Sequence, residues 1–512
     1  MATCEVNEAE LVEFPASTAL RTESLSESVA ILLLLTVVQR CIGFLRSILF
    51  CRWLSAEQLG EWDMAFGFLM LAAPLACLGL PGSFGRYVEH YRQQSQLRTF
   101  LLRTSMTTLT MAVFAVAAMA WWPRWFERLI FGDETHLSLV PLLAATLAIV
   151  IVYNFLTSLF IALRRNRVVS LMQFTASLVF ASVGSALLLW SAASTRSVIA
   201  AFAVSCFVAV VLMLPWVRSI WRALPPSPGP MAHRTMWNRV LPFAFWLWLT
   251  NWLSNMFEIT DRFLLVHYSG LQSASALDLV GQYHSARVLP VLLVGVAELL
   301  GAVITPHLSS DWEAGRRRRV SHRLNFIVKL FGLGLASASV AVLVGAPLLF
   351  QVGFGGKYAQ GQEIIPWALM YCTWSSLSVI AFNYLWCAEK SRLVTLVLLF
   401  GLTLNVALNL VLLPAWGLWG AVIATSIAKG LSVVLLGVLS ARSGMRIGSG
   451  IMLVAALPLL LPLGALPTFL GLIFVAARCW NRSERVRIAS EIRRVISALR
   501  HPGSTGRGLW AR

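Results

Sequence analysis

Charged and amide side chains lie at regular spacing inside an otherwise apolar stretch, residues 240 to 266. One face of a helix over this stretch would carry four of them, Asn251, Asn255, Glu258 and Arg262. Asp261 stands beside Arg262. Arginine suits phosphate because its planar guanidinium stays charged and donates two parallel hydrogen bonds. This helix face therefore predicts a site for a large anionic ligand.

Two further apolar stretches carry charges of the same kind. Arg40 and Arg46 lie in 29 to 53, and Arg287 and Glu298 lie in 279 to 306, eleven residues apart and so on one face if the helix is continuous. Charges at bilayer depth cost roughly 2.5 to 3.5 kcal/mol each on insertion scales, so they are expected to line a wet cavity. We predict that the three helices enclose one polar space.

The acidic residues among these charges have two interpretations. Glu258, Asp261 and Glu298 could bind a coupling ion, H⁺ or Na⁺, or they could serve as partners of neighbouring arginines, as Glu258 would for Arg262 four residues on. The eight cysteines form no CxxC pair, so we expect neither a disulfide framework nor a metal site. No cofactor is expected.

Composition identifies the setting of these side chains as a membrane. Of the 512 residues, 58% are hydrophobic and 12% are charged, too few charges for a soluble protein. Lys and Arg exceed Asp and Glu by 41 to 23, a net charge of +18. In so apolar a chain this excess favours contact with anionic membrane lipids, and no nucleic-acid partner is expected.

Twelve stretches are long enough to cross a bilayer as helices, which needs about 20 residues each. They are 29 to 53, 62 to 82, 100 to 122, 139 to 163, 168 to 191, 197 to 217, 240 to 266, 279 to 306, 324 to 352, 364 to 388, 393 to 413 and 416 to 440. A last apolar region, 449 to 477, contains three prolines and is interpreted as a hairpin turning near Leu463 and Gly464. The sequence thus predicts an all-α polytopic membrane protein of about fourteen transmembrane helices.

Basic residues concentrate in every second loop, the pattern of cytoplasmic loops. Both termini are then cytoplasmic, and the protein is placed in the cell membrane, the cytoplasmic or inner membrane, as a multi-pass protein. The expected parts are an acidic N-terminus (1 to 28), an N-lobe (29 to 217), a cytoplasmic linker (218 to 239), a C-lobe (240 to 440), the hydrophobic hairpin (449 to 477) and a basic tail (478 to 512).

The two lobes resemble each other in sequence at a nearly constant offset. Leu-Gly-Glu-Trp at 59 to 62 matches Val-Gly-Gln-Tyr at 280 to 283, an offset of 221. Further along, Pro81 matches Pro306 and Pro141 matches Pro366, an offset of 225. Two repeats of six helices keep the same orientation in the membrane, and transporters built from such repeats place the substrate path between them.

Several motifs resemble the polysaccharide biosynthesis flippases of the MATE-like MOP superfamily. They include QRCIGFLRSILFCRW from Gln39, FEITDRFLLVHYSG from Phe257 and LNVALNLVLLPAWGLWGAVIATSIAKG from Leu404. The likeness covers residues 29 to about 440. Related lipid II flippases also carry two arginines six residues apart on the first helix, which implies that Arg40 and Arg46 bind a pyrophosphate.

The resemblance implies a flippase that moves polyprenyl-pyrophosphate-linked oligosaccharide across the cytoplasmic membrane by alternating access, for O-antigen, capsule or exopolysaccharide. Its partners would be this lipid-linked oligosaccharide, membrane lipids and the polysaccharide polymerase machinery. Such work needs no enzymatic step. The alternatives are a cation-coupled multidrug exporter of the same superfamily and a membrane glycan polymerase or ligase. The short outer loops, without paired carboxylates, disfavour the enzyme.

Overall fold

The computed structural model describes residues 25 to 190, 193 to 225, 232 to 480 and 484 to 485. The N-lobe holds α1 (Leu25–Trp53), α2 (Ala56–Ala76), α3 (Phe84–Gln93), α4 (Leu97–Trp121), α5 (Pro123–Phe131), α6 (Val140–Ala162), α7 (Asn166–Trp190) and α8 (Thr195–Ala223). The second half holds α9 (His233–Tyr268), α10 (Ser273–Arg287), α11 (Pro290–Glu313), α12 (Arg317–Leu348), α13 (Ala359–Cys387), α14 (Ser391–Trp416), α15 (Leu418–Arg442), α16 (Ser449–Ala456) and α17 (Ala465–Arg478). Short helical turns η1 (Leu80–Ser83), η2 (Leu137–Leu139), η3 (Leu349–Gly353) and η4 (Leu457–Leu463) join them.

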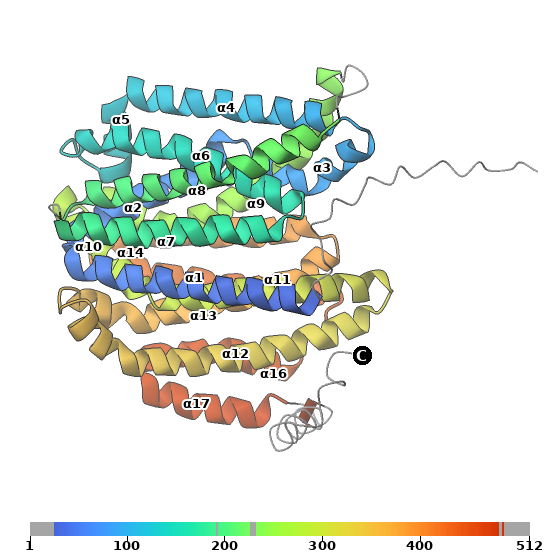
Figure 1. Ribbon diagram of the computed structural model, residues 1–512. Coiled ribbons are helices and arrows are strands. Elements are labelled where there is room, and N and C mark those ends of the chain that lie inside the picture. Colours follow the sequence, from blue (N-terminus) through green and yellow to red (C-terminus); the bar gives the residue numbers. More distant parts are fainter. Residues whose placement is uncertain (1–24, 191–192, 226–231, 481–483, 486–512) are drawn as a thin grey trace, which may run out of the picture.

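The long helices run side by side, from α4 at one edge of the molecule to α17 at the opposite edge (Figure 1). Every described element is helical, as a bilayer requires of a chain whose backbone groups must bond within their own segment. Nine of the described helices are long and apolar enough to cross a membrane, and a tenth qualifies if α2 and α3 count as one bent span. The all-α membrane fold is confirmed, while the number of spans and the side of the termini stay predictions.

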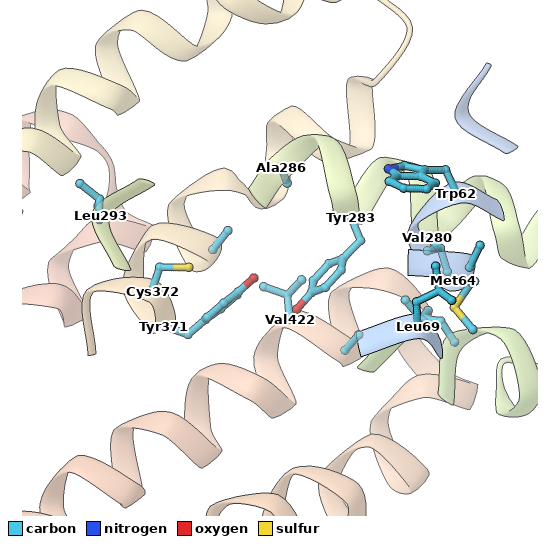
Figure 2. Close-up of a cluster of buried hydrophobic side chains, with 14 of the residues drawn as sticks. Trp62, Met64, Leu69, Val280, Tyr283, Ala286, Leu293, Tyr371, Cys372 and Val422 are labelled. Atoms are coloured by element: carbon cyan, nitrogen blue, oxygen red, sulfur yellow. The ribbon is translucent and has the colours of Figure 1, made fainter. Parts of the chain in front are cut away.

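The two halves share one hydrophobic core where α2 lies against α10. Figure 2 shows three α2 side chains beside three from α10: Trp62, Met64 and Leu69 with Val280, Tyr283 and Ala286. The crossing is close because each helix has a glycine there. A Cβ at Gly60 would lie 1.9 Å from the carbonyl oxygen of Leu277, and a Cβ at Gly281 would lie 1.9 Å from that of Ala56. The two glycines are equivalent positions of the sequence repeat.

The predicted continuous helix over 279 to 306 is wrong. The chain forms two helices, α10 and α11, which meet at Val288 and Leu289. Pro290 begins α11 at the position where proline is tolerated, because its missing N–H would have no partner in a first turn. Arg287 and Glu298 therefore lie on different helices.

The predicted cytoplasmic linker, 218 to 239, is partly helical. Helix α8 continues to Ala223 and α9 begins at His233, so much of the linker is helical. The matched prolines differ in structure: Pro81 lies in η1, where α2 and α3 bend by 62°, whereas Pro306 lies inside α11.

The C-terminal apolar region turns where the sequence predicts, at Gly464, whose φ of 105° favours glycine. Its two arms pack closely, since a Cβ at Gly450 would lie 2.1 Å from the carbonyl oxygen of Cys479. The predicted double crossing stays a prediction. The acidic N-terminus up to residue 24, and the basic tail except 478 to 480 and 484 to 485, lie outside the described residues.

Candidate functional site

A cavity of about 840 Å³ lies between the two halves of the bundle. Its walls come from α1, α2, α6, α7 and α8 of the first half and from α9, α10 and α11 of the second. Among the predicted site residues it is lined by Arg40, Arg46, Asn255, Glu258, Arg262 and Arg287. The polar space that the sequence predicts between the lobes is therefore present.

Helix α1 contributes the Gln39, Gly43 and Arg46 face to the wall, together with Arg40. The Arg46 guanidinium lies 4.3 Å from the centre of the Phe180 ring on α7. Within the described part of the chain, no carboxylate forms an ion pair with Arg46. A cation held by an aromatic face keeps its hydrogen-bond donors available for an incoming anion.

Helix α9 turns three of its four predicted residues toward the cavity, namely Asn255, Glu258 and Arg262. Asn251 lies one turn before Asn255 on the helix. It is exposed and is not among the residues that line the cavity. It accepts a hydrogen bond of 3.2 Å from the Asn255 amide. Asn251 thus supports a lining residue instead of lining the cavity itself.

Glu258 does not form an ion pair with Arg262, the pairing considered from the sequence. The Arg262 guanidinium donates to the backbone carbonyl of Glu258. The Glu258 carboxylate instead accepts a 2.6 Å hydrogen bond from Arg287, and Lys429 of α15 lies 3.8 Å away. The i to i+4 spacing is satisfied by the backbone, so the carboxylate is left for cations of other helices.

The side-chain partner of Arg262 is Asp63 on α2. Nη1 of Arg262 donates to Oδ1 of Asp63 at 2.8 Å, and Nδ1 of His284 lies 2.8 Å from the same oxygen. The Arg262 and Asp63 side chains are only 7% and 4% exposed. This buried group joins the two halves across the α2 and α10 crossing.

A second ion pair between the halves connects Arg40 of α1 and Glu298 of α11. Nη2 of Arg40 lies 3.3 Å from a Glu298 carboxylate oxygen, and the side chains are 46% and 57% exposed. Glu298 is not among the cavity-lining residues. This pair is far more exposed than the Arg262 and Asp63 pair, so we take the Arg40 end as the open end of the cavity and the Asp63 end as the closed one.

Asp261 faces away from the cavity, although it is next to Arg262 in sequence. It is 2% exposed and accepts hydrogen bonds from four uncharged side chains on three helices: Tyr283 (2.9 Å), Asn405 (2.9 Å), Asn409 (3.0 Å) and Thr425. Its two sequence neighbours on the helix point about 100° to either side, so adjacency in the chain does not place them together.

Sequence reasoning missed three charged or titratable residues of the site, Asp63, His284 and Lys429. The repeat contains the information for the first two, because the offset of 221 that relates Gly60 to Gly281 also relates Asp63 to His284. Lys429 could have been found as well, because it is the one charged residue in the predicted span 416 to 440. Among the described residues no group of three or more His, Cys, Asp or Glu has the arrangement of a metal site.

This arrangement can bind a large anion from one side only. Arg40, Arg46, Arg262 and Arg287 line a cavity whose other walls mix polar side chains with apolar and aromatic ones, and one end is closed by packed helices. If the two halves move relative to each other, such a site can close toward one membrane face and open toward the other, and this movement needs no covalent chemistry.

Comparison with known proteins begins with a family. The family described as polysaccharide biosynthesis protein matches residues 25 to 312, more than half of the chain. A membrane protein of Methanocaldococcus jannaschii is 26% identical over 170 residues, and this match spans about a third of the length of each protein, 32%.

Solved transporters share the fold. A lipid II flippase MurJ in an inward closed conformation superposes with a TM-score of 0.66 at 12% identity, covering 88% of this chain and 98% of that one. An inward-facing multidrug resistance MATE family transporter of the MOP superfamily gives 0.60 at 11% identity, covering 80% and 96%. At these identities the likeness establishes the architecture alone, so the transported substrate must be inferred from the residues of the site.

Proposed function

The chain belongs to the polysaccharide biosynthesis protein family, and from that premise we propose that it is a flippase for polyprenyl-diphosphate-linked oligosaccharide. The cavity between the halves carries the proposal, because its arginines match a diphosphate and its size admits sugars. Each sugar hydroxyl moved into hydrocarbon without a partner costs about 2 to 7 kcal/mol, so the glycan needs such a polar path. The polyprenyl chain can stay in the surrounding lipid.

The proposed cycle is alternating access across the cytoplasmic membrane. The cavity receives cargo while open at the Arg40 end and releases it once the Asp63 end opens instead. We also propose that the polysaccharide polymerase machinery takes up the cargo on the far side. The chain's own residues bind, orient and release the lipid, and no bond is made or broken.

For energy coupling we propose Asp261 as the residue that binds H⁺ or Na⁺. Glu258 and Glu298 are already paired with arginines, whereas Asp261 is surrounded by neutral donors. The side-chain oxygens of Asn405 and Asn409 accept no hydrogen bond from the described residues, and oxygen ligands suit a hard cation. An ion moving through 100 mV supplies about 2.3 kcal/mol.

The coupling proposal is tested by measuring transport in proteoliposomes with imposed Na⁺ or pH gradients. Asp261→Asn keeps the shape of the side chain and should abolish the dependence on the gradient. An unchanged dependence in this variant would reject Asp261. Glu298→Gln is the matched control, with its gradient dependence retained.

The flippase proposal is tested in cells with and without the gene, by probing which membrane face displays the lipid-linked glycan. Loss of the gene should leave oligosaccharide on the cytoplasmic face and remove surface polysaccharide. If the glycan instead reaches the outer face unpolymerised, the protein is a polymerase or ligase. If surface polysaccharide is normal and drug resistance falls, it is a multidrug exporter.

A further inference from the structure

Asp63 and His284 are equivalent positions of the repeat, and they touch each other. The offset of 221 also relates Gly60 to Gly281, the glycines that let α2 and α10 cross closely. Equivalent residues of two repeats can meet only where the axis relating the repeats passes between them. The contact of 2.8 Å between Asp63 and His284 therefore marks the place where the halves must part for the closed end to open.

The two oxygens of the Asp63 carboxylate differ in their hydrogen bonds. Both Arg262 and His284 reach the same oxygen, Oδ1, while Oδ2 accepts no hydrogen bond from the described residues. Nε of Arg262 likewise donates to none of them. All three side chains border the cavity. A single carboxylate thus leaves donors and acceptors unsatisfied in a buried place, which costs free energy.

We propose that Asp63 is an internal counter-ion, which the diphosphate of the cargo displaces from Arg262 and His284. This inference rests on the proposed function. A diphosphate offers more charge and more acceptor oxygens than one carboxylate, so it satisfies the Arg262 donors better. Arg287 and its partner Glu258 line the same cavity, so a second guanidinium is present for the incoming anion.

Displacement couples cargo binding to opening. Once Asp63 is released, the α2 side of the crossing loses its ion pair with α9 and its contact with His284 on α10. What remains at the crossing is the apolar packing in Figure 2 and the glycine contact. A substitution that removes the charge of Asp63 should therefore both weaken the closure and strengthen anion binding. Removal of a merely structural ion pair would not strengthen anion binding.

The first experiment measures binding of undecaprenyl diphosphate to the full chain in lipid nanodiscs. Asp63→Asn keeps the side-chain shape and frees Arg262, so it should bind about tenfold more tightly, equivalent to about 1.4 kcal/mol. Glu61→Gln is the matched control, since Glu61 lies on the same helix and contacts His136 of its own half at 3.0 Å. Its affinity should equal that of the wild type.

The second experiment measures the opening of the closed end by spin-label distances. Labels at Trp190 and Leu271, both exposed, report on the first and second half. Undecaprenyl diphosphate should lengthen this distance in the wild type, and Asp63→Asn should show the longer distance before any lipid is added. His284→Gln, which keeps the Asp63 and Arg262 pair, should shift both readouts part of the way.

Two results would overturn the inference, and they can be told apart. Equal affinity and equal distances in wild type and Asp63→Asn would reject the counter-ion while leaving the flippase proposal standing. Absence of binding to undecaprenyl diphosphate in the wild type and in every variant would reject the proposed cargo, and with it this role of Asp63.

Discussion

Two arginine–carboxylate pairs between the halves, both among the described residues, have the same chemistry and opposite burial. Arg40 and Glu298 pair at 3.3 Å with both side chains about half exposed, whereas Arg262 and Asp63 pair at 2.8 Å and are almost fully buried. Arg40 lines the cavity, so water in the cavity can compete for its guanidinium when the first pair separates. The second pair has no such replacement, so separating it leaves a buried charge. Under the proposed mechanism, the end closed by the buried pair is therefore the end that needs a ligand to open.

The largest expected effect comes from breaking the buried pair. Arg262→Ala leaves Asp63 in the interior without its guanidinium partner and should lower the free energy of unfolding by about 3 to 5 kcal/mol. Arg40→Ala removes an exposed pair and should cost less than about 1 kcal/mol. Denaturant unfolding of both variants in the same detergent measures the difference, and equal losses would contradict the contrast between the ends.

The next effect concerns the glycine crossing that surrounds the buried pair. Gly281→Leu puts side-chain atoms where the carbonyl of Ala56 already lies, so α2 and α10 must separate, and we expect a loss of about 3 kcal/mol. Gly345→Ala is the control, because a Cβ there meets nothing within 4 Å and should raise helix stability slightly. Thermal unfolding ranks the two variants; a stable, transport-competent Gly281→Leu would show that the crossing tolerates separation.

A smaller effect distinguishes charge from geometry in the open part of the cavity. Arg46→Ala should abolish transport while membrane insertion stays normal. Arg46→Lys restores the charge without the bidentate donors and should leave transport about tenfold below wild type. Flipping of a fluorescent lipid-linked oligosaccharide in proteoliposomes measures both variants. Full activity of the lysine variant would mean that charge alone suffices there.

The smallest expected effect is a pH dependence of stability that comes from His136. This histidine contacts carboxylates of its own half, whereas His284 contacts a carboxylate of the other half. His136 precedes η2 and contacts Glu61 and Asp133 at 3.0 and 2.9 Å. Burial lowers the pKa of His136, but the hydrogen bonds with the two carboxylates outweigh it and raise this pKa to about 9. Because the pKa of an unfolded histidine is about 6.5, this stabilisation is complete below that pH and is lost as pH rises through about 9.

Melting temperatures measured across this pH window test the His136 contact. The wild type should lose a few degrees toward alkaline pH, and His136→Gln should flatten the curve. The distance between labels at Trp190 and Leu271 should not follow this titration, since Glu61, Asp133 and His136 belong to one half. A pH-dependent change of that distance would show that the contact also controls the halves.

The sequence by itself determined the helices, the repeat and the polar faces. Apolar length predicts helices because a backbone in lipid must satisfy its own hydrogen bonds, and helical spacing placed Asn255, Glu258 and Arg262 on one wall. The sequence also carries a signal for the helix break, because Pro290 favours the first turn of a helix, but the predicted span 279 to 306 runs through it. These features follow from local chemistry, which neighbouring residues specify.

Only the tertiary structure decided which charges meet. Arg262 pairs with Asp63, 199 residues away, and Asp261 binds Asn409, 148 residues away, although Arg262 and Asp261 are adjacent in the chain. Any carboxylate on a facing helix could satisfy an arginine, so residue type and spacing leave the partner open. The packing of α2 against α10 and α9 settles the choice, because glycines set how closely the helices approach and thus which side chains reach each other.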